Sequence, residues 1–268
     1  MSDATTPTDD VRIELVADYR LSDAGNSERL IRMFGDEIRY CALLKQWFVW
    51  DGCRWSPDEI HRMLDLATRT VKMIFAEAAV ADTTDRREAI ARWAIRSESL
   101  AGRRAMIDGA VFMVPVRPDE LDARPDLFNC QNGTLNLVTG EFREHRKEDL
   151  LTKISGVEYI PGATCPMWID HLKTVFRGSD DLITGFQSFL GYCLLQYNPA
   201  QILAILWGGG KNGKSETLKT VALILRDYAV NIEAATLMRS KYTDAGRARP
   251  DILTLKGARF STVTEPEQ

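Results

Sequence analysis

The feature that most constrains the fold is the segment from Ile202 to Ser215, whose sequence is ILAILWGGGKNGKS. It fits the phosphate-binding pattern G-x-x-x-x-G-K-[ST]. An apolar run precedes the glycines, and residues 216–226 have helical spacing of apolar side chains. Strand, glycine loop and helix together let backbone N–H groups approach phosphates, and the helix N-terminus adds partial positive charge. The sequence therefore predicts a buried strand at 202–207 that leads into a nucleotide-binding loop.

The loop residues have distinct expected roles. Lys214 is expected to act as a catalytic residue that reaches the β- and γ-phosphates of ATP, and the Ser215 hydroxyl is expected to ligate Mg²⁺. A chance glycine turn before a helix is the alternative, which the strand–loop–helix context disfavours. The residues expected to bind the nucleotide are Gly208, Gly209, Gly210, Lys211, Asn212, Gly213, Lys214, Ser215 and Glu216.

A P-loop ATPase also needs an acidic residue that holds Mg²⁺ or polarises the attacking water. Residues 259–264 are rich in β-branched and aromatic side chains, as strands are, and Glu265 follows them. We therefore expect a strand beside 202–207 and a catalytic, metal-binding Glu265 close to Ser215. Glu267 is the second candidate, and a surface acid after an ordinary strand is the alternative interpretation.

Composition indicates an ordinary globular chain. Of its 268 residues, 45% are hydrophobic and 27% are charged, which is typical of folded domains. No apolar run approaches the ~20 residues of a membrane span, so no membrane partner is expected. The N-terminus lacks a basic or apolar signal region, and we expect a disordered tail on a cytoplasmic protein. The five cysteines form no C-x-x-C pair, and the three histidines match no metal spacing.

Periodic patterns upstream of the loop predict an α-rich region. Helical spacing occurs at 21–34, 60–78, 86–112 (with an interruption near Gly102), 167–176 and 180–196. Turn signals at Asp51-Gly52 and Thr139-Gly140 predict β-hairpins at 46–55 and 131–142. The predicted fold is therefore α/β in class. A disordered tail (1–20) precedes an α-rich domain with two β-hairpins (21–180) and an incomplete P-loop NTPase domain (181–268).

Several segments together resemble the helicase part of phage and plasmid primase–helicases, a branch of the superfamily 3 helicases that includes poxvirus primase–helicases. The resemblance covers nearly the whole chain after the tail. It implies an AAA+-like ATPase domain, a ring that is usually hexameric, and ATP-driven movement along single-stranded DNA. The segments are LSDAGNSERLIRMFGD, FVWDGCRW, FNCQNGTLNLVTGEFREHRKEDLLTK, CPMWIDHL, FQSFLGYCL, GGGKNGKSETL and LKGARFSTVTE.

The resemblance also assigns residues. Glu265 matches the family's Walker B acid, and Lys211 stands where a small residue is usual. Family members continue past the Walker B acid into a DNA-contacting segment, a sensor asparagine and an arginine finger, whereas three residues follow Glu265 here. The Walker A positions are matched by Gly208, Gly213, Lys214 and Ser215, and the candidates for a substitute finger are Arg247, Arg249 and Arg259.

Two function classes are consistent with these features. The first is an ATP-dependent DNA helicase, or the N-terminal fragment of one, in phage or plasmid replication. The second is a nucleotide-binding module that does not hydrolyse ATP and is completed by a separately encoded C-terminal portion or a primase. A small-molecule kinase shares the loop, but the upstream domain does not suit one. From the resemblance we expect this chain alone to bind ATP and to hydrolyse it slowly.

Overall fold

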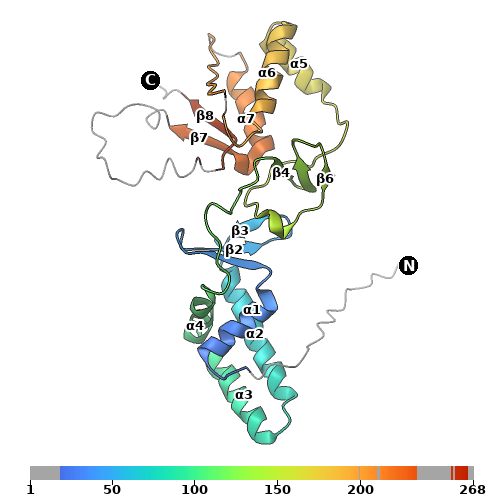
Figure 1. Ribbon diagram of the computed structural model, residues 1–268. Coiled ribbons are helices and arrows are strands. Elements are labelled where there is room, and N and C mark those ends of the chain that lie inside the picture. Colours follow the sequence, from blue (N-terminus) through green and yellow to red (C-terminus); the bar gives the residue numbers. More distant parts are fainter. Residues whose placement is uncertain (1–18, 199, 210–211, 234–254, 256, 265–268) are drawn as a thin grey trace, which may run out of the picture. The chain divides into compact units, whose positions relative to one another are not determined.

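The computed structural model describes residues 19–198, 200–209, 212–233, 255 and 257–264 (Figure 1). The chain divides into two compact units: unit 1 comprises Met1–Val49 and Asp58–Pro115, and unit 2 comprises Trp50–Pro57 and Val116–Gln268. Helices and small sheets occur in the described residues, which confirms a mixed α/β chain. The domain boundary expected near residue 180 stays a prediction. None of the helices in the described ranges is long and apolar enough to span a membrane.

Unit 1 contains four helices, α1 (Asp23–Phe34), α2 (Arg62–Ala79), α3 (Thr84–Ser97) and α4 (Leu100–Ala110). Hydroxyl caps set the starts of α1, α3 and α4. Ser22 accepts a hydrogen bond from the Gly25 amide and so caps α1. Ser99 likewise accepts from the Gly102 amide at 3.0 Å. The region predicted as one helix interrupted near Gly102 therefore breaks at Ser99, because the Ser99 hydroxyl begins a new helix there.

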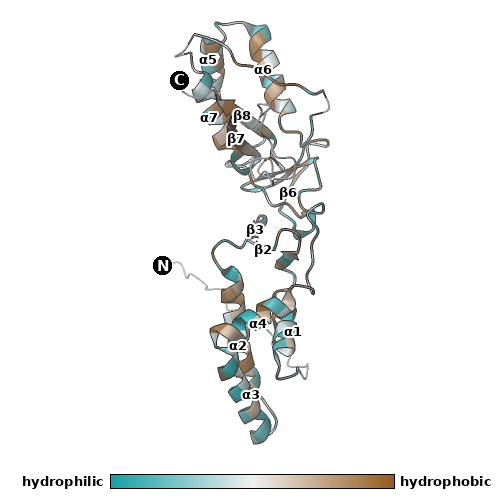
Figure 2. Cartoon of the chain, turned by 90° about the vertical axis from the view of Figure 1, so that its left-hand side faces the viewer, coloured by the Kyte–Doolittle hydropathy of each residue, from teal (hydrophilic) through white to brown (hydrophobic). Residues whose placement is uncertain are grey.

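The core of unit 1 is formed by the apolar faces of these helices and one strand pair. Figure 2 shows hydrophilic and hydrophobic residues on the same helices, as expected for amphipathic elements. Strand β1 (Ile38–Cys41) pairs antiparallel with β2 (Gln46–Trp50). Arg29, 4% exposed, donates to the Glu77 carboxylate at 2.7 Å, so this buried charge is paired. The main core residues are Leu30, Phe34, Ile38, Val49, Met63, Leu66, Ala67, Val71, Met106, Ile107, Ala110 and Val114.

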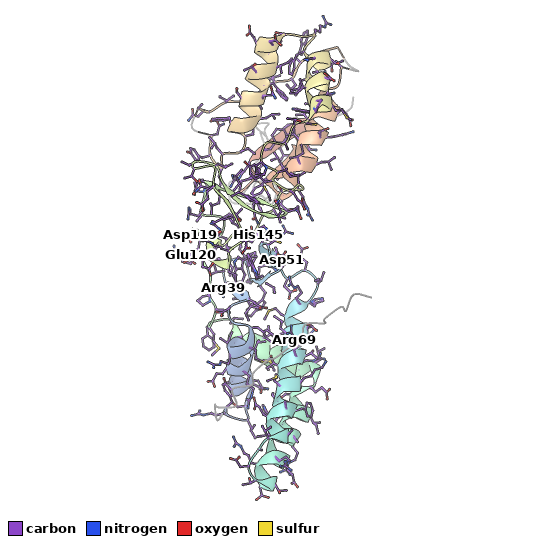
Figure 3. All side chains as sticks on the ribbon, turned by 90° about the vertical axis from the view of Figure 1, so that its right-hand side faces the viewer. Arg39, Asp51, Arg69, Asp119, Glu120 and His145 are labelled. Atoms are coloured by element: carbon purple, nitrogen blue, oxygen red, sulfur yellow. The ribbon has the colours of Figure 1, made fainter. Side chains whose placement is uncertain are left out.

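Unit 2 begins with the turn that leads to β3 (Trp55–Pro57). The Asp51 carboxylate (labelled in Figure 3) accepts from the amides of Cys53 and Arg54 at 2.9 and 2.8 Å. Gly52 has φ +102°. The predicted turn is present, but only its glycine has positive φ, because the Asp51 side chain closes the turn instead. Trp50 and Trp55 meet edge to face with centroids 5.8 Å apart.

A three-stranded antiparallel sheet follows, with β4 (Leu127–Cys130), β5 (Gly133–Asn136) and β6 (Phe142–Arg143) in that order. The hairpin predicted at 131–142 is present as β5 and β6. The sequence did not predict β4, which pairs with β5 so that Cys130 lies opposite Gly133. Residues 131–132 are consequently a tight turn between β4 and β5.

The rest of unit 2 contains α5 (Pro166–Val175), α6 (Asp180–Tyr192), α7 (Lys214–Leu225), β7 (Ala229–Glu233) and β8 (Phe260–Thr264). The helices predicted at 167–176, 180–196 and 216–226 are confirmed within a few residues at each end. One core cluster joins β4, α7 and β8, so the antiparallel sheet packs on the region that follows the glycine loop. The buried members of that cluster are Phe128, Cys130, Val221, Leu225, Tyr228 and Phe260.

The predicted strand at 202–207 is the main correction to the fold. Residues 201–208 form no regular secondary structure, and Ile205 and Trp207 are 81% and 93% exposed. Strand β8 pairs in parallel with β7 in a two-stranded sheet, so the expected pairing of β8 with a strand at 202–207 does not occur in the described residues. A strand needs a neighbour to complete its hydrogen-bond ladder, and none of the strands that the structure describes pairs with this run.

Candidate nucleotide-binding site

The start of α7 is shaped by Gly213. This residue has φ 80° and ψ −3°, in the left-handed region that favours glycine. A β-carbon at this position would lie 2.9 Å from Cγ2 of Val175 and 3.3 Å from Cε1 of His171, both on α5. Gly213 has no side chain to cap the helix, so the first-turn N–H groups of α7 are left for solvent or a ligand.

Gly213→Ala is expected to lower the free energy of unfolding by about 1–2 kcal/mol, because alanine is strained at positive φ and its methyl group would press on Val175. Equilibrium urea denaturation measures this. Gly209→Ala is the matched control, since a β-carbon at 209 meets nothing within 4 Å. Equal effects of the two substitutions would contradict the role given to Gly213.

Lys214 is held by the loop that precedes it. Its ammonium donates to the Gly208 carbonyl at 3.0 Å and to Oδ1 of Asn212 at 2.8 Å. A β-carbon at Gly208 would collide with Nδ2 of Asn212, so the Asn212 side chain would have to shift to accommodate it. The structure thus brings together three of the residues predicted from the motif. Gly210 and Lys211 lie outside the described residues.

Ser215 and Glu216 occupy the exposed first turn of α7. A carboxylate such as that of Glu216 is favourable near a helix N-terminus, where the helix dipole is positive. Ser215 lines the same cavity as Gly208 and Lys214. A hydroxyl and an ammonium therefore face one space, which suits an anionic ligand and its metal ion.

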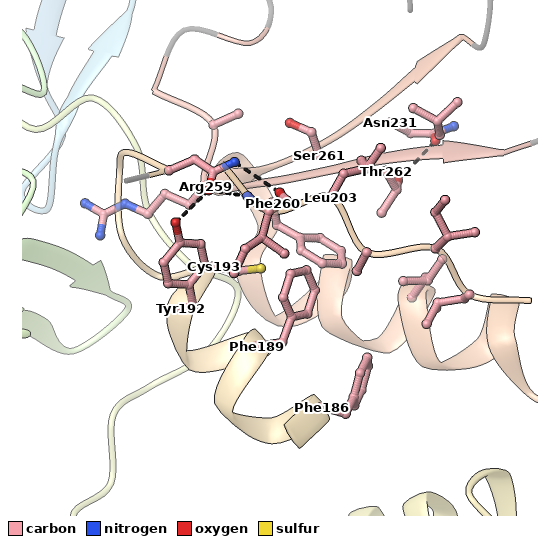
Figure 4. A pocket seen from close by; sticks show the side chains of 18 of the residues that line it. Phe186, Phe189, Tyr192, Cys193, Leu203, Asn231, Arg259, Phe260, Ser261 and Thr262 are labelled. Carbon is pink, nitrogen blue, oxygen red and sulfur yellow. Dashed lines mark hydrogen bonds between the residues drawn. The ribbon is translucent and has the colours of Figure 1, made fainter. Parts of the chain in front are cut away.

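That cavity has a volume of about 1710 Å³ and lies within unit 2. Figure 4 shows Phe186 and Phe189 of α6 on one side and Phe260 and Thr262 of β8 on the other. Ligand pockets commonly measure about 300–1,000 Å³, so the space is sufficient for a nucleotide. The exposed run 202–207 also lines it, although it does not form the predicted strand.

The second predicted catalytic residue, Glu265, lies outside the described residues. The strand expected before it is confirmed as β8, which ends at Thr264. Within the pair β7–β8, the Thr262 hydroxyl donates to Oδ1 of Asn231 at 3.1 Å. The proximity of Glu265 to Ser215 stays a prediction.

Arg259, directly before β8, was one candidate for a substitute arginine finger. It is 9% exposed. Its guanidinium donates to the carbonyls of Leu127 and Leu194 and lies 4.8 Å from the ring centroid of Tyr228. Burial lowers the pKa of Arg259 and raises the pKa of Tyr228. An arginine fixed inside unit 2 cannot reach a neighbouring subunit, so that interpretation is wrong. Arg247 and Arg249 lie outside the described residues.

Two side chains of unit 2 had no predicted role. Asn129 is fully buried and receives or donates four hydrogen bonds within unit 2. His171 contacts Thr217 of α7 through Nε2, at 2.7 Å from the hydroxyl oxygen. Both lie in segments that carry the family resemblance, and His171 lies in the helix predicted at 167–176, but only the tertiary structure brings their partners close.

The described part of the chain is thus a mixed α/β protein with a candidate phosphate-binding loop at the start of α7. The chain belongs to the D5 N terminal like family, which matches residues 27–177. This confirms the resemblance to the primase–helicase family.

Two viral proteins are similar to this chain. Over 157 residues it is 24% identical to "Putative helicase L207/L206" of Acanthamoeba polyphaga mimivirus. These aligned residues make up 55% of this chain and 16% of the viral protein. Over 233 residues it is 23% identical to "Putative primase C962R" of African swine fever virus. This alignment covers 78% of this chain and 24% of the viral protein. The chain therefore spans at most about a quarter of the length of these relatives.

Proposed function

We propose that this chain carries the nucleotide-binding part of an ATP-dependent DNA helicase that acts in replication. The observation that carries the proposal is the position of the Lys214 ammonium, which lies at the N-terminus of α7 against Gly208 and Asn212. Positive charge from the helix and from the lysine converges there on a cavity that can hold a nucleotide. The names of the viral relatives, a helicase and a primase, support the replication class.

In this proposal ATP binds with its phosphates on the first turn of α7. Lys214 exchanges its bonds to Gly208 and Asn212 for bonds to phosphate oxygens, which are stronger because both partners are charged. Ser215 ligates Mg²⁺, and Glu265 supplies the acid that holds the metal ion or polarises water. Single-stranded DNA is the proposed second partner, and self-association into a ring is the proposed assembly.

The nucleotide site is tested by calorimetry with ATP, ADP and AMP, each with and without Mg²⁺. Because Lys214 is placed to reach the β- and γ-phosphates, AMP is expected to bind at least about tenfold more weakly than ATP. Removal of Mg²⁺ is expected to weaken ATP binding. Equal affinity for AMP and ATP would show that the protein recognises the nucleoside rather than the β- and γ-phosphates, and it would contradict the role proposed for Lys214.

The helicase assignment is tested by phosphate release with and without a single-stranded oligonucleotide. We expect the oligonucleotide to raise the rate, because DNA-driven helicases couple turnover to the strand. Unchanged release together with tight ATP binding would favour the second class, a nucleotide-binding assembly module.

A further inference from the structure

We propose that His171 of α5 is a positioning residue for the glycine loop, acting through Thr217 of α7 on the carbonyl of Gly213. The inference rests on the proposed function, because it concerns how the loop is held for phosphate binding. It adds a helix upstream of the phosphate-binding motif to the elements that determine the affinity for ATP.

The contacts form a chain of two hydrogen bonds. Nε2 of His171 lies 2.7 Å from Oγ1 of Thr217, and this hydroxyl donates to the Gly213 carbonyl at 2.9 Å. A hydroxyl has one proton. When that proton is directed at Gly213, the oxygen is left to accept from an Nε2–H of His171. Thr217 is 2% exposed, so water does not replace these bonds readily.

His171 is itself fixed by packing. Its ring stacks on Trp168 with centroids 5.8 Å apart and an interplanar angle of 24°. Trp168 packs against two core clusters of unit 2. The residue after His171, Leu172, is fully buried against Ile183 and Phe186 of α6. The imidazole therefore stands on a helix that is anchored in the core.

The hydrogen bond from the Thr217 hydroxyl to the Gly213 carbonyl acts at the residue that directly precedes Lys214. Gly213 adopts the left-handed conformation immediately before Lys214, and its carbonyl also accepts the Thr217 amide at 2.9 Å. Rotation of the peptide group between residues 213 and 214 would redirect the first N–H of α7 and the stem of Lys214. Two hydrogen bonds that Thr217 donates to the Gly213 carbonyl oppose that rotation, and His171 holds the hydroxyl that donates one of them. A loop held in one conformation binds its ligand with less loss of conformational entropy.

The experiment compares variants that keep or remove the donor. His171→Phe keeps an aromatic ring on Trp168 but has no donor, and we expect the Kd for ATP to rise about 3- to 10-fold. His171→Gln restores an N–H at similar reach, and we expect it to recover most of the affinity. Thr217→Val removes the hydroxyl and with it both hydrogen bonds, so it should weaken ATP binding at least as much as His171→Phe, whereas Thr217→Ser should bind like the wild type. The double variant His171→Phe/Thr217→Val should bind no more weakly than Thr217→Val, because the bond from His171 is already lost in that variant.

A second measurement does not depend on nucleotide. Long-range ¹H–¹⁵N NMR of the imidazole, with the His171 signals assigned by their loss in His171→Gln, should show a protonated Nε2 whose shift changes in Thr217→Val. If the wild type binds ATP and His171→Phe binds it equally well, the inference is overturned while the nucleotide site stands. If the wild type binds no ATP, both proposals fail. If His171→Phe does not fold, the pair Thr217→Val and Thr217→Ser decides the question.

Discussion

Replacement of Lys214 by alanine is expected to reduce the affinity for ATP by at least about a hundredfold, or about 3 kcal/mol. The ammonium lies at the head of α7, within hydrogen-bond distance of Gly208 and Asn212. Hydrogen bonds between two charged groups are roughly twice as strong as neutral ones. Among the described residues of α7, Lys214 is the basic residue that lines the cavity. Calorimetric titration of the 268-residue chain with ATP and Mg²⁺ measures the change.

Lys219→Ala is the matched control for this substitution. Lys219 lies on the same helix and is exposed, so its loss changes the net charge equally but removes no contact of the loop. We expect its Kd for ATP to stay within about twofold of the wild-type value, because exposed charges are largely screened. Equal affinity of the wild type and Lys214→Ala would refute the site, and equal weakening by both substitutions would show a general charge effect instead.

The elements that the sequence predicted well are those that local interactions determine. Helix α1 has a serine cap directly before it and an apolar face along its twelve residues, and α7 follows a glycine with positive φ. The Asp51 turn is closed by its own side chain. In each case the information lies within a few residues along the chain, so pattern and propensity were sufficient.

The elements that the sequence did not predict depend on distant partners. The apolar run 202–207 has the composition of a buried strand, yet β8 pairs with β7 in parallel. Composition shows that a segment suits a sheet, but it does not show which strand lies beside it. The same applies to Arg259, whose guanidinium donates to carbonyls 65 and 132 residues away in the chain. Its burial could not be predicted from a charged residue at the start of a strand.

Asn129 is the polar residue of β4 on which several segments of unit 2 depend. Its amide donates to the carbonyls of Cys53 and Lys153 at 2.9 and 3.2 Å. Its carbonyl oxygen accepts from the Thr134 hydroxyl at 3.0 Å and lies 2.8 Å from Nδ1 of His145. The residue is 0% exposed. One side chain thus satisfies groups from four separate parts of the chain.

Asn129→Ala is expected to lower the free energy of unfolding by about 3 kcal/mol, because buried donors and acceptors that lose their partner bear the full cost of desolvation. Thr134→Val removes one of the four bonds and is expected to cost about 1 kcal/mol. Equilibrium urea denaturation followed by circular dichroism measures both, with an unchanged denaturant slope showing that the unfolded state is comparable.

Asn132→Ala is the control that separates the effect of burial from that of hydrogen bonding, because Asn132 lies in the turn between β4 and β5. Asn132 also makes two hydrogen bonds, donating to the Tyr159 carbonyl at 3.0 Å and accepting from the Tyr159 amide at 2.9 Å. It is exposed, however, so water can replace its side chain as a partner. We expect a loss below about 1 kcal/mol. If Asn132→Ala were as destabilising as Asn129→Ala, burial would not determine the cost of losing these hydrogen bonds. The larger loss of stability expected for Asn129→Ala because of its burial would then be contradicted.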